Sequence, residues 1–180
     1  MMNSPGPAPR VRTATLGDAA AIGETHVEGW RTAYRGLLPA DYLAALRVED
    51  RQRMWERVIE HRPESVGLVV CTDRVAGFVS GGVSRDADAT TDTLELFAIY
   101  AHPDYWGQGI GRALLTWFEE RARHAGARHA TLWVLRDNDR AIRFYEAHGW
   151  QADGCEKTVE IGGRRVVEVR YRRQLTEERT

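Results

Sequence analysis

The chain has 180 residues, of which 43% are hydrophobic and 28% charged, as expected of an ordinary soluble globular protein. Its formal net charge of −1 excludes a nucleic-acid-binding protein that relies on a strongly basic surface. The two Cys and six His lack the spacing of a metal site, and no apolar run could cross a membrane, which together predict a cytoplasmic protein without metal.

The N-terminal half predicts a strand, three helices and a hairpin. Residues 1–10 contain three prolines and are expected to form a disordered tail. Thr15 and Asp18 form a capping-box pattern that begins a helix ending at Gly36. The other expected elements are a strand at Val11–Ala14, helices from Pro39 to Leu46 and over Asp50–His61, and paired strands at Val66–Cys71 and Val75–Ser80.

The C-terminal half predicts a buried central strand followed by alternating helices and strands. Thr93–Tyr100 is apolar on both faces, as in a strand covered from both sides. One domain is expected to span residues 11–173, with a frayed tail at 174–180. The elements expected after the central strand are a helix to His124, a strand at His129–Leu135, a helix from Asn138 to His148, and a hairpin of Cys155–Ile161 with Arg165–Arg172 across Gly162 and Gly163.

Three alternating glycines, Gly107, Gly109 and Gly111, stand between the central strand and the next helix. The first N–H groups of a helix have no partner within it, the helix dipole attracts anions there, and glycine allows a phosphate close to the backbone. A P-loop is excluded because no Lys with Ser or Thr follows Gly111, and the dinucleotide fingerprint fails because Arg112 replaces its third glycine. The segment predicts another kind of phosphate site, or alternatively a turn with no ligand.

Two motifs resemble those of the GCN5-related N-acetyltransferase (GNAT) family. Residues 106–111 match the family's acetyl-CoA loop, although Trp106 stands where the family usually has Gln or Arg. In residues 138–150 the positions that match a second family motif are Asn138, Ala141, Tyr145, Gly149 and Trp150. The resemblance covers residues 11–173 and implies an α/β (α+β) fold, with a central mixed, mostly antiparallel sheet, a splayed central strand and flanking helices.

The resemblance also implies an activity, in which acetyl-CoA gives its acetyl group directly to a primary amine of a small molecule or peptide within a ternary complex. No metal is implied. Asn138 is expected to contact the cofactor or, alternatively, only to cap its helix. The other residues implied to bind the cofactor are Ile99, Tyr100, Ala101, Gly107, Gln108, Gly109, Ile110, Gly111 and Arg112.

Two residues are candidates for proton transfer. An alkyl amine with a pKa of about 10 is protonated at neutral pH and needs a base. Glu95 fits because a carboxylate in an apolar strand is costly unless it is used or paired; an ion pair with an Arg, or a water chain as base, are the alternatives. By resemblance Tyr145 protonates the departing thiolate, and a core tyrosine is the alternative.

The acceptor side is less defined by the sequence. The resemblance places Trp30 and Tyr34 in its wall, with core packing as the alternative, and Asp86, Asp88 and Asp92 could attract a cationic amine. The C-terminal hairpin could pair two subunits in a homodimer. A catalytically silent acyl-CoA-binding sensor or regulatory module of the same fold is the alternative function.

Overall fold

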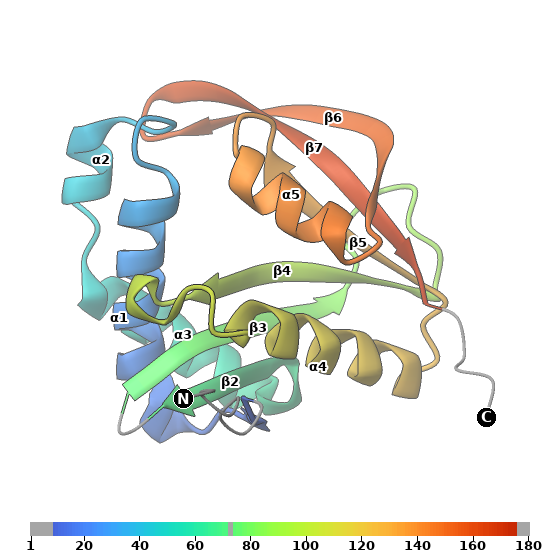
Figure 1. Ribbon diagram of the computed structural model, residues 1–180, viewed down its shortest axis with the longest axis horizontal. Helices are drawn as coiled ribbons and strands as arrows, with labels where there is room; N and C mark the ends of the chain where they lie inside the picture. Colours follow the sequence, from blue (N-terminus) through green and yellow to red (C-terminus); the bar gives the residue numbers. More distant parts are fainter. Residues whose placement is uncertain (1–8, 72–73, 176–180) are drawn as a thin grey trace, which may run out of the picture.

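The computed structural model describes residues 9–71 and 74–175 (Figure 1). Its seven strands form one sheet in the order β1-β2-β3-β4-β5-β7-β6, in which β4 and β5 are parallel and all other neighbours antiparallel. The predicted mixed, mostly antiparallel sheet with a central β4 is therefore confirmed. The strands are β1 (Val11–Thr13), β2 (Val66–Cys71), β3 (Arg74–Val83), β4 (Thr93–Ala101), β5 (His129–Leu135), β6 (Gln151–Ile161) and β7 (Arg164–Gln174).

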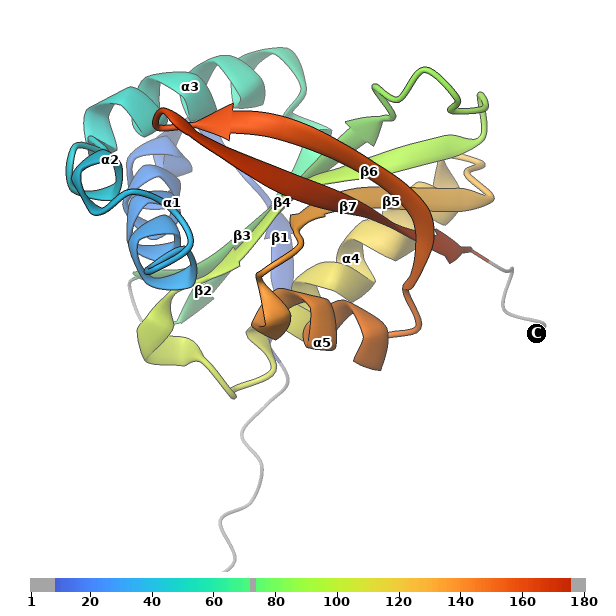
Figure 2. The ribbon, with the colours of Figure 1, turned by 90° about the horizontal axis from the view of Figure 1, so that it is seen from above.

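Helices cover both faces of the sheet (Figure 2). One face packs against α1 and α3, where the rings of Trp55 and Phe78 lie 4.9 Å apart, and the opposite face packs against α4. Among the described residues, no helix is both long and apolar enough to span a membrane. The helices are α1 (Ala19–Ala33), α2 (Ala40–Ala44), α3 (Val48–His61), α4 (Ile110–His124) and α5 (Asp139–Ala147).

The capping box at the first helix is confirmed, with a small correction to the helix start. The Thr15 N–H donates to the Asp18 carboxylate at 2.7 Å, but residues 16–18 form a short 3-10 turn and α1 begins at Ala19. The Arg12 guanidinium also binds this carboxylate at 2.7 Å and lowers the pKa of Asp18 to about 2. Arg12 belongs to β1, so the cap ties the first strand to α1.

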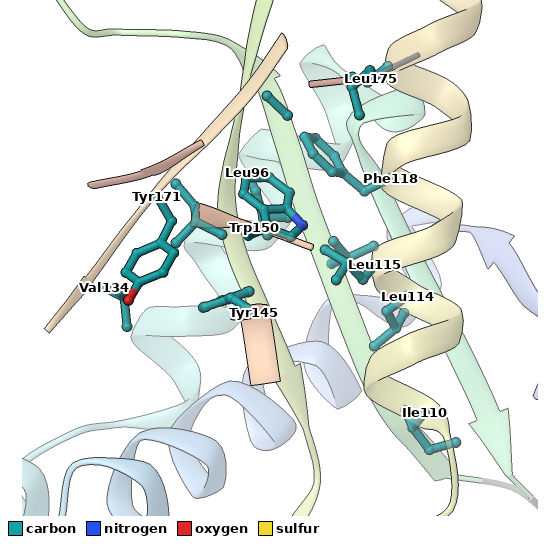
Figure 3. Close-up of a cluster of buried hydrophobic side chains, with 14 of the residues drawn as sticks. Leu96, Ile110, Leu114, Leu115, Phe118, Val134, Tyr145, Trp150, Tyr171 and Leu175 are labelled. Carbon is teal, nitrogen blue, oxygen red and sulfur yellow. The ribbon is translucent and has the colours of Figure 1, made fainter. Parts of the chain in front are cut away.

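The core under α4 extends further along the chain than the sequence indicates (Figure 3). Leu114, Leu115 and Phe118 pack against Trp150 from the segment after α5. Leu175 joins this cluster with only 5% of its surface exposed, and its N–H donates to the Arg128 carbonyl at 2.8 Å. The expectation that the chain frays from residue 174 is therefore wrong at Leu175, while residues 176–180 lie outside the described part.

The two strands that extend furthest beyond their predicted bounds, β3 and β6, each contain a glycine that explains the difference. β3 continues past Ser80 to Val83, since Gly81 has no Cβ to collide with the Phe118 ring of α4. β6 begins at Gln151 instead of Cys155; a bulge between Ala152 and Glu156, with Gly154 at φ +86°, breaks the alternation that marks a strand.

The β6–β7 hairpin reaches across the molecule to α2 (Figure 2). Its predicted turn at Gly162–Gly163 is confirmed, with both glycines at positive φ. A Cβ at Gly162 would overlap the Tyr42 ring, so glycine allows the tip to pack on α2. Ile161 and Val166 pack beside Leu135 in the same cluster. The hairpin thus joins β5 to the α1–α2 region; a second role in pairing subunits stays a prediction.

Candidate active site

The sheet opens into a cavity where β4 and β5 separate. The two strands pair only over Thr93–Leu96 and His129–Leu132; beyond these, β4 stays with β3 and β5 stays with β7. The resulting cavity has a volume of about 550 Å³. It brings together the end of β4, the glycine loop, α5, the C-terminal part of α1 and the β6–β7 hairpin.

The separated part of β4 presents unpaired peptide groups to this cavity. The His102 N–H donates to the Ala76 carbonyl of β3 at 2.8 Å. Because pairing alternates along an antiparallel ladder, the peptide groups of Ile99 and Ala101 point away from β3 and toward β5. The indole N–H of Trp106 donates to the Ala101 carbonyl at 2.9 Å, and this hydrogen bond fixes the end of β4.

The glycine loop forms the beginning of α4 beside these peptides. Gly107 and Gly109 have φ of +76° and +79°, a backbone conformation that favours glycine, and Gly109 is the N-cap of α4. The first helical N–H groups, at Ile110, Gly111 and Arg112, have no partner within the helix, and all three residues line the cavity. A Cβ at Gly111 would lie 3.2 Å from the Phe144 ring, so the Phe144 side chain packs closely against the start of α4.

Most of the predicted cofactor residues line the cavity, with one exception. Gln108 is exposed, does not line the cavity, and donates from its side chain to the Asp104 carbonyl at 3.2 Å. Asn138 lines the cavity and also caps α5, since its Oδ1 accepts from the Ala141 N–H at 3.2 Å. Both readings of Asn138 are therefore compatible with its position, with the amide NH₂ left for a ligand.

Tyr145 is buried, yet it lines the cavity. Its ring packs against Phe144 and Trp150, with centroids 5.4 and 6.2 Å away. Burial raises the pKa of the Tyr145 hydroxyl well above its usual range, so the hydroxyl is protonated at neutral pH. Its packing matches the core reading, and its access to the cavity matches the proton-donor reading.

Glu95 does not line the cavity. Its buried carboxylate is held by the Arg85 guanidinium at 2.5 and 3.3 Å and by the Arg85 N–H at 3.0 Å. This is the ion pair that the sequence left open as the alternative to a catalytic base. The role of Glu95 as base stays a prediction, and these contacts count against it.

The predicted acceptor wall is found in the cavity. Trp30 and Tyr34 of α1 both line it, and their rings meet edge to face with centroids 5.0 Å apart. The Tyr34 hydroxyl lies 2.9 Å from the Tyr100 hydroxyl, and burial raises the pKa of both groups. The side of the cavity facing α1 is thus built of aromatic rings and neutral hydroxyl groups.

The acidic side chains of the loop after β3 lie outside the cavity. Asp86 and Asp88 are bound by Arg170 of β7, at 3.2 Å and at 2.6 to 2.7 Å, and Asp86 also accepts from the Trp133 indole at 2.9 Å. Asp92 accepts from the Thr90 hydroxyl. None of the three lines the cavity, and the charges of Asp86 and Asp88 anchor the loop to β7.

Sequence reasoning missed one charged residue on the acceptor side. Glu168 of β7 is the one carboxylate among the described residues that line the cavity, and it lies close enough to Tyr34 to influence its pKa. Lys157 binds it at 3.3 Å and lies 3.9 Å from the Trp133 ring centre. The available signal was that Glu168 is the single acid in the basic strand 164–173. Other missed lining residues are Phe97, Trp133, Arg140, Phe144, His148 and Ile161.

Comparison with known proteins agrees with this geometry. The profile of the acetyltransferase (GNAT) family matches residues 28–150. YuaI of Bacillus subtilis, an uncharacterized N-acetyltransferase, is 35% identical over 163 residues, which cover 88% of this chain and 89% of YuaI. The chain belongs to the GNAT family, and it is an acetyltransferase of that family.

Solved structures share the fold. PaiA N-acetyltransferase from Thermoplasma acidophilum, in complex with coenzyme A, has a TM-score of 0.73 and 18% identity, covering 93% of this chain and 99% of its own. YncA from Salmonella typhimurium, solved with acetyl-CoA, has a TM-score of 0.71 and 22% identity, covering 97% and 98%. The likeness extends over nearly the whole length of each protein.

Proposed function

We propose that the protein transfers the acetyl group of acetyl-CoA directly to a primary amine, with both substrates bound together. The observation that carries this proposal is a single cavity that joins the glycine loop, the free edge of β4 and the Tyr145 hydroxyl. The CoA and acetyl-CoA complexes of PaiA and YncA support the choice of donor.

The residues present fit an acyl-CoA. The N–H groups of Ile110, Gly111 and Arg112 at the α4 N-terminus would hold the phosphates, because they lack helical partners and the dipole favours anions there. The Ile99 carbonyl and the Ala101 N–H would bind the extended amide arm as a neighbouring strand does. When bound, acetyl-CoA supplies an acetyl group activated as a thioester.

Two groups would then stabilise charge during the transfer, and an aromatic wall would exclude water. The Ile99 N–H points into the cavity and would donate to the carbonyl oxygen as negative charge develops there. The Tyr145 hydroxyl holds its proton at neutral pH because burial raises its pKa, so it can donate to the departing sulfur. The aromatic wall of Trp30 and Tyr34 limits access of water to the same point.

For the proton of the acceptor amine, we place Glu168 ahead of Glu95. Glu168 lines the cavity, whereas both carboxylate oxygens of Glu95 are occupied by Arg85. A carboxylate at the cavity wall can attract an ammonium group and take its proton directly or through a water molecule. Lys157 binds only Oε2 of Glu168, at 3.3 Å, so among the described residues Oε1 is left for the amine.

The test is an assay of free CoA formed from acetyl-CoA with a panel of primary amines, beside thermal denaturation with and without acetyl-CoA. We expect acetyl-CoA to raise the melting temperature and at least one amine to accelerate CoA release. A raised melting temperature with no acceleration by any amine would favour the catalytically silent acyl-CoA-binding module.

A further inference from the structure

A second cavity of about 550 Å³ adjoins the first along β4. It lies between α1, α3 and the ends of β3 and β4. Four residues, Trp30, Phe97, Ala98 and Tyr100, line both cavities, so the two share a wall. A molecule with its amine in the first cavity could extend its remaining atoms along this shared wall into the second.

The charged side chains of the described residues that line this second cavity are all basic. Its lining includes Arg57, Arg62 and Arg85, and no carboxylate of the described residues lines it; Glu56, Glu60 and Glu64 from the same segment do not. Arg85 is neutralised by its ion pair with Glu95. Arg57 and Arg62 lack side-chain ion pairs within the described part of the chain, so two positive charges remain for a ligand.

The floor of the cavity presents buried hydrogen-bond donors. His26 is 6% exposed and lines the cavity, and its Nδ1 accepts from the Trp55 indole N–H at 3.1 Å. Burial lowers the pKa of His26 to about 3, so the ring is neutral and carries its proton on Nε2. That N–H has no partner among the described residues, and neither has the hydroxyl of Ser80, which is 4% exposed and also lines the cavity.

Neutral donors and two guanidinium groups that line one cavity fit an oxyanion, which would accept from the donors and offset the positive charge. We infer that the acceptor amine carries a carboxylate or a phosphonate-like group, which binds in this second cavity while the amine enters the first. This inference rests on the proposed function and narrows its substrate class. Arg57 and Arg62 select the anion through charge, and His26 and Ser80 receive its oxygens.

Anion binding can be measured without turnover. With coenzyme A saturating the glycine loop, the protein is titrated with acetate and, separately, with methylphosphonate, while the indole N–H signal of Trp55 is followed by NMR. We expect a saturable shift, because this N–H bonds to His26. The variant Arg57→Gln/Arg62→Gln should need at least about tenfold more anion, since a charge-assisted hydrogen bond contributes about 1.5–3 kcal/mol. The matched control is Arg53→Gln, on the same helix but outside the cavity, and should titrate like the wild type.

Turnover provides the second arm, with ω-amino carboxylates and ω-aminoalkyl phosphonates of increasing length compared with their neutral amides. We expect the double variant to lose about 10- to 100-fold in kcat/KM for the anionic acceptors and little for the amides. Equal losses for both classes, or an unchanged Trp55 titration in the double variant, would overturn the inference. If the anions titrate as expected but no amine is acetylated, the proposed function fails and the anion site remains.

Discussion

At the scale of single residues, replacing Tyr145 tests whether the cavity is a catalytic site. We expect Tyr145→Phe to keep the fold, because the ring still packs on Phe144 and Trp150. Acetyl-CoA affinity should change little, since the hydroxyl acts as charge develops on sulfur. Turnover should fall by about 10- to 1,000-fold. Steady-state kinetics beside a direct binding isotherm measure both; an unchanged rate would leave Tyr145 a core aromatic.

Substitutions at Glu168 and Glu95 can be compared to decide which carboxylate is the general base. Glu168→Gln should lower turnover at neutral pH by about 10²- to 10⁴-fold, and recover in part near pH 10, where alkyl amines lose their proton. Glu95→Gln should instead lower the melting temperature, because it weakens the buried contacts to Arg85, and leave turnover close to wild type. The opposite pattern across a pH series would restore Glu95 as the base.

These two carboxylates also show what residue patterns can and cannot predict. A lone Glu in an apolar strand correctly indicated a buried carboxylate at position 95. Its partner, Arg85, comes from a loop whose path depends on the extension of β3. Glu168 lines the cavity because β7 pairs with β5, and this pairing joins segments more than thirty residues apart, which local spacing does not encode.

At the scale of an element, the two ends of α4 offer a controlled test of phosphate binding. Gly109 and Gly126 both have positive φ, near +80°, one at each end of the helix. Gly109→Asp should abolish the rise in melting temperature caused by acetyl-CoA. The substitution adds negative charge beside the N–H groups at the start of α4 that are proposed to bind the phosphates. Gly126→Asp should suffer similar backbone strain and keep the rise. If acetyl-CoA raised the melting temperatures of the two variants equally, the glycine loop would not be part of the binding site.

Elements were predictable where a local signal marks them. Neighbouring residues alone indicate the Thr15–Asp18 cap, the glycine turn at 162–163, the Asn138 cap and the central position of β4. Predictions failed where packing overrides the local signal. β3 continues through glycines because α4 lies close to it. In β6 a bulge breaks the alternation by which a strand is recognised in the sequence.

At the scale of the whole molecule, the C-terminal end of β7 closes the core under α4. Leu175→Ala should lower the free energy of unfolding by about 2–5 kcal/mol, because it leaves a cavity beside the buried cluster. Val83→Ala is the control, since Val83 is 70% exposed and should cost under about 0.5 kcal/mol. Urea denaturation compares the two; equal small effects would mean that residue 175 belongs to a frayed tail after all.

The central claim concerns the whole protein: one cavity brings an acyl-CoA and an amine together. The most direct measurement uses acetyl-CoA with a labelled acetyl group, mixed with the amine panel, and mass spectrometry of every acceptor. The account predicts labelled amide in at least one acceptor, formed in equal amount to free coenzyme A and reduced in Tyr145→Phe. Formation of free coenzyme A and labelled acetate alone, with no labelled acceptor, would contradict it.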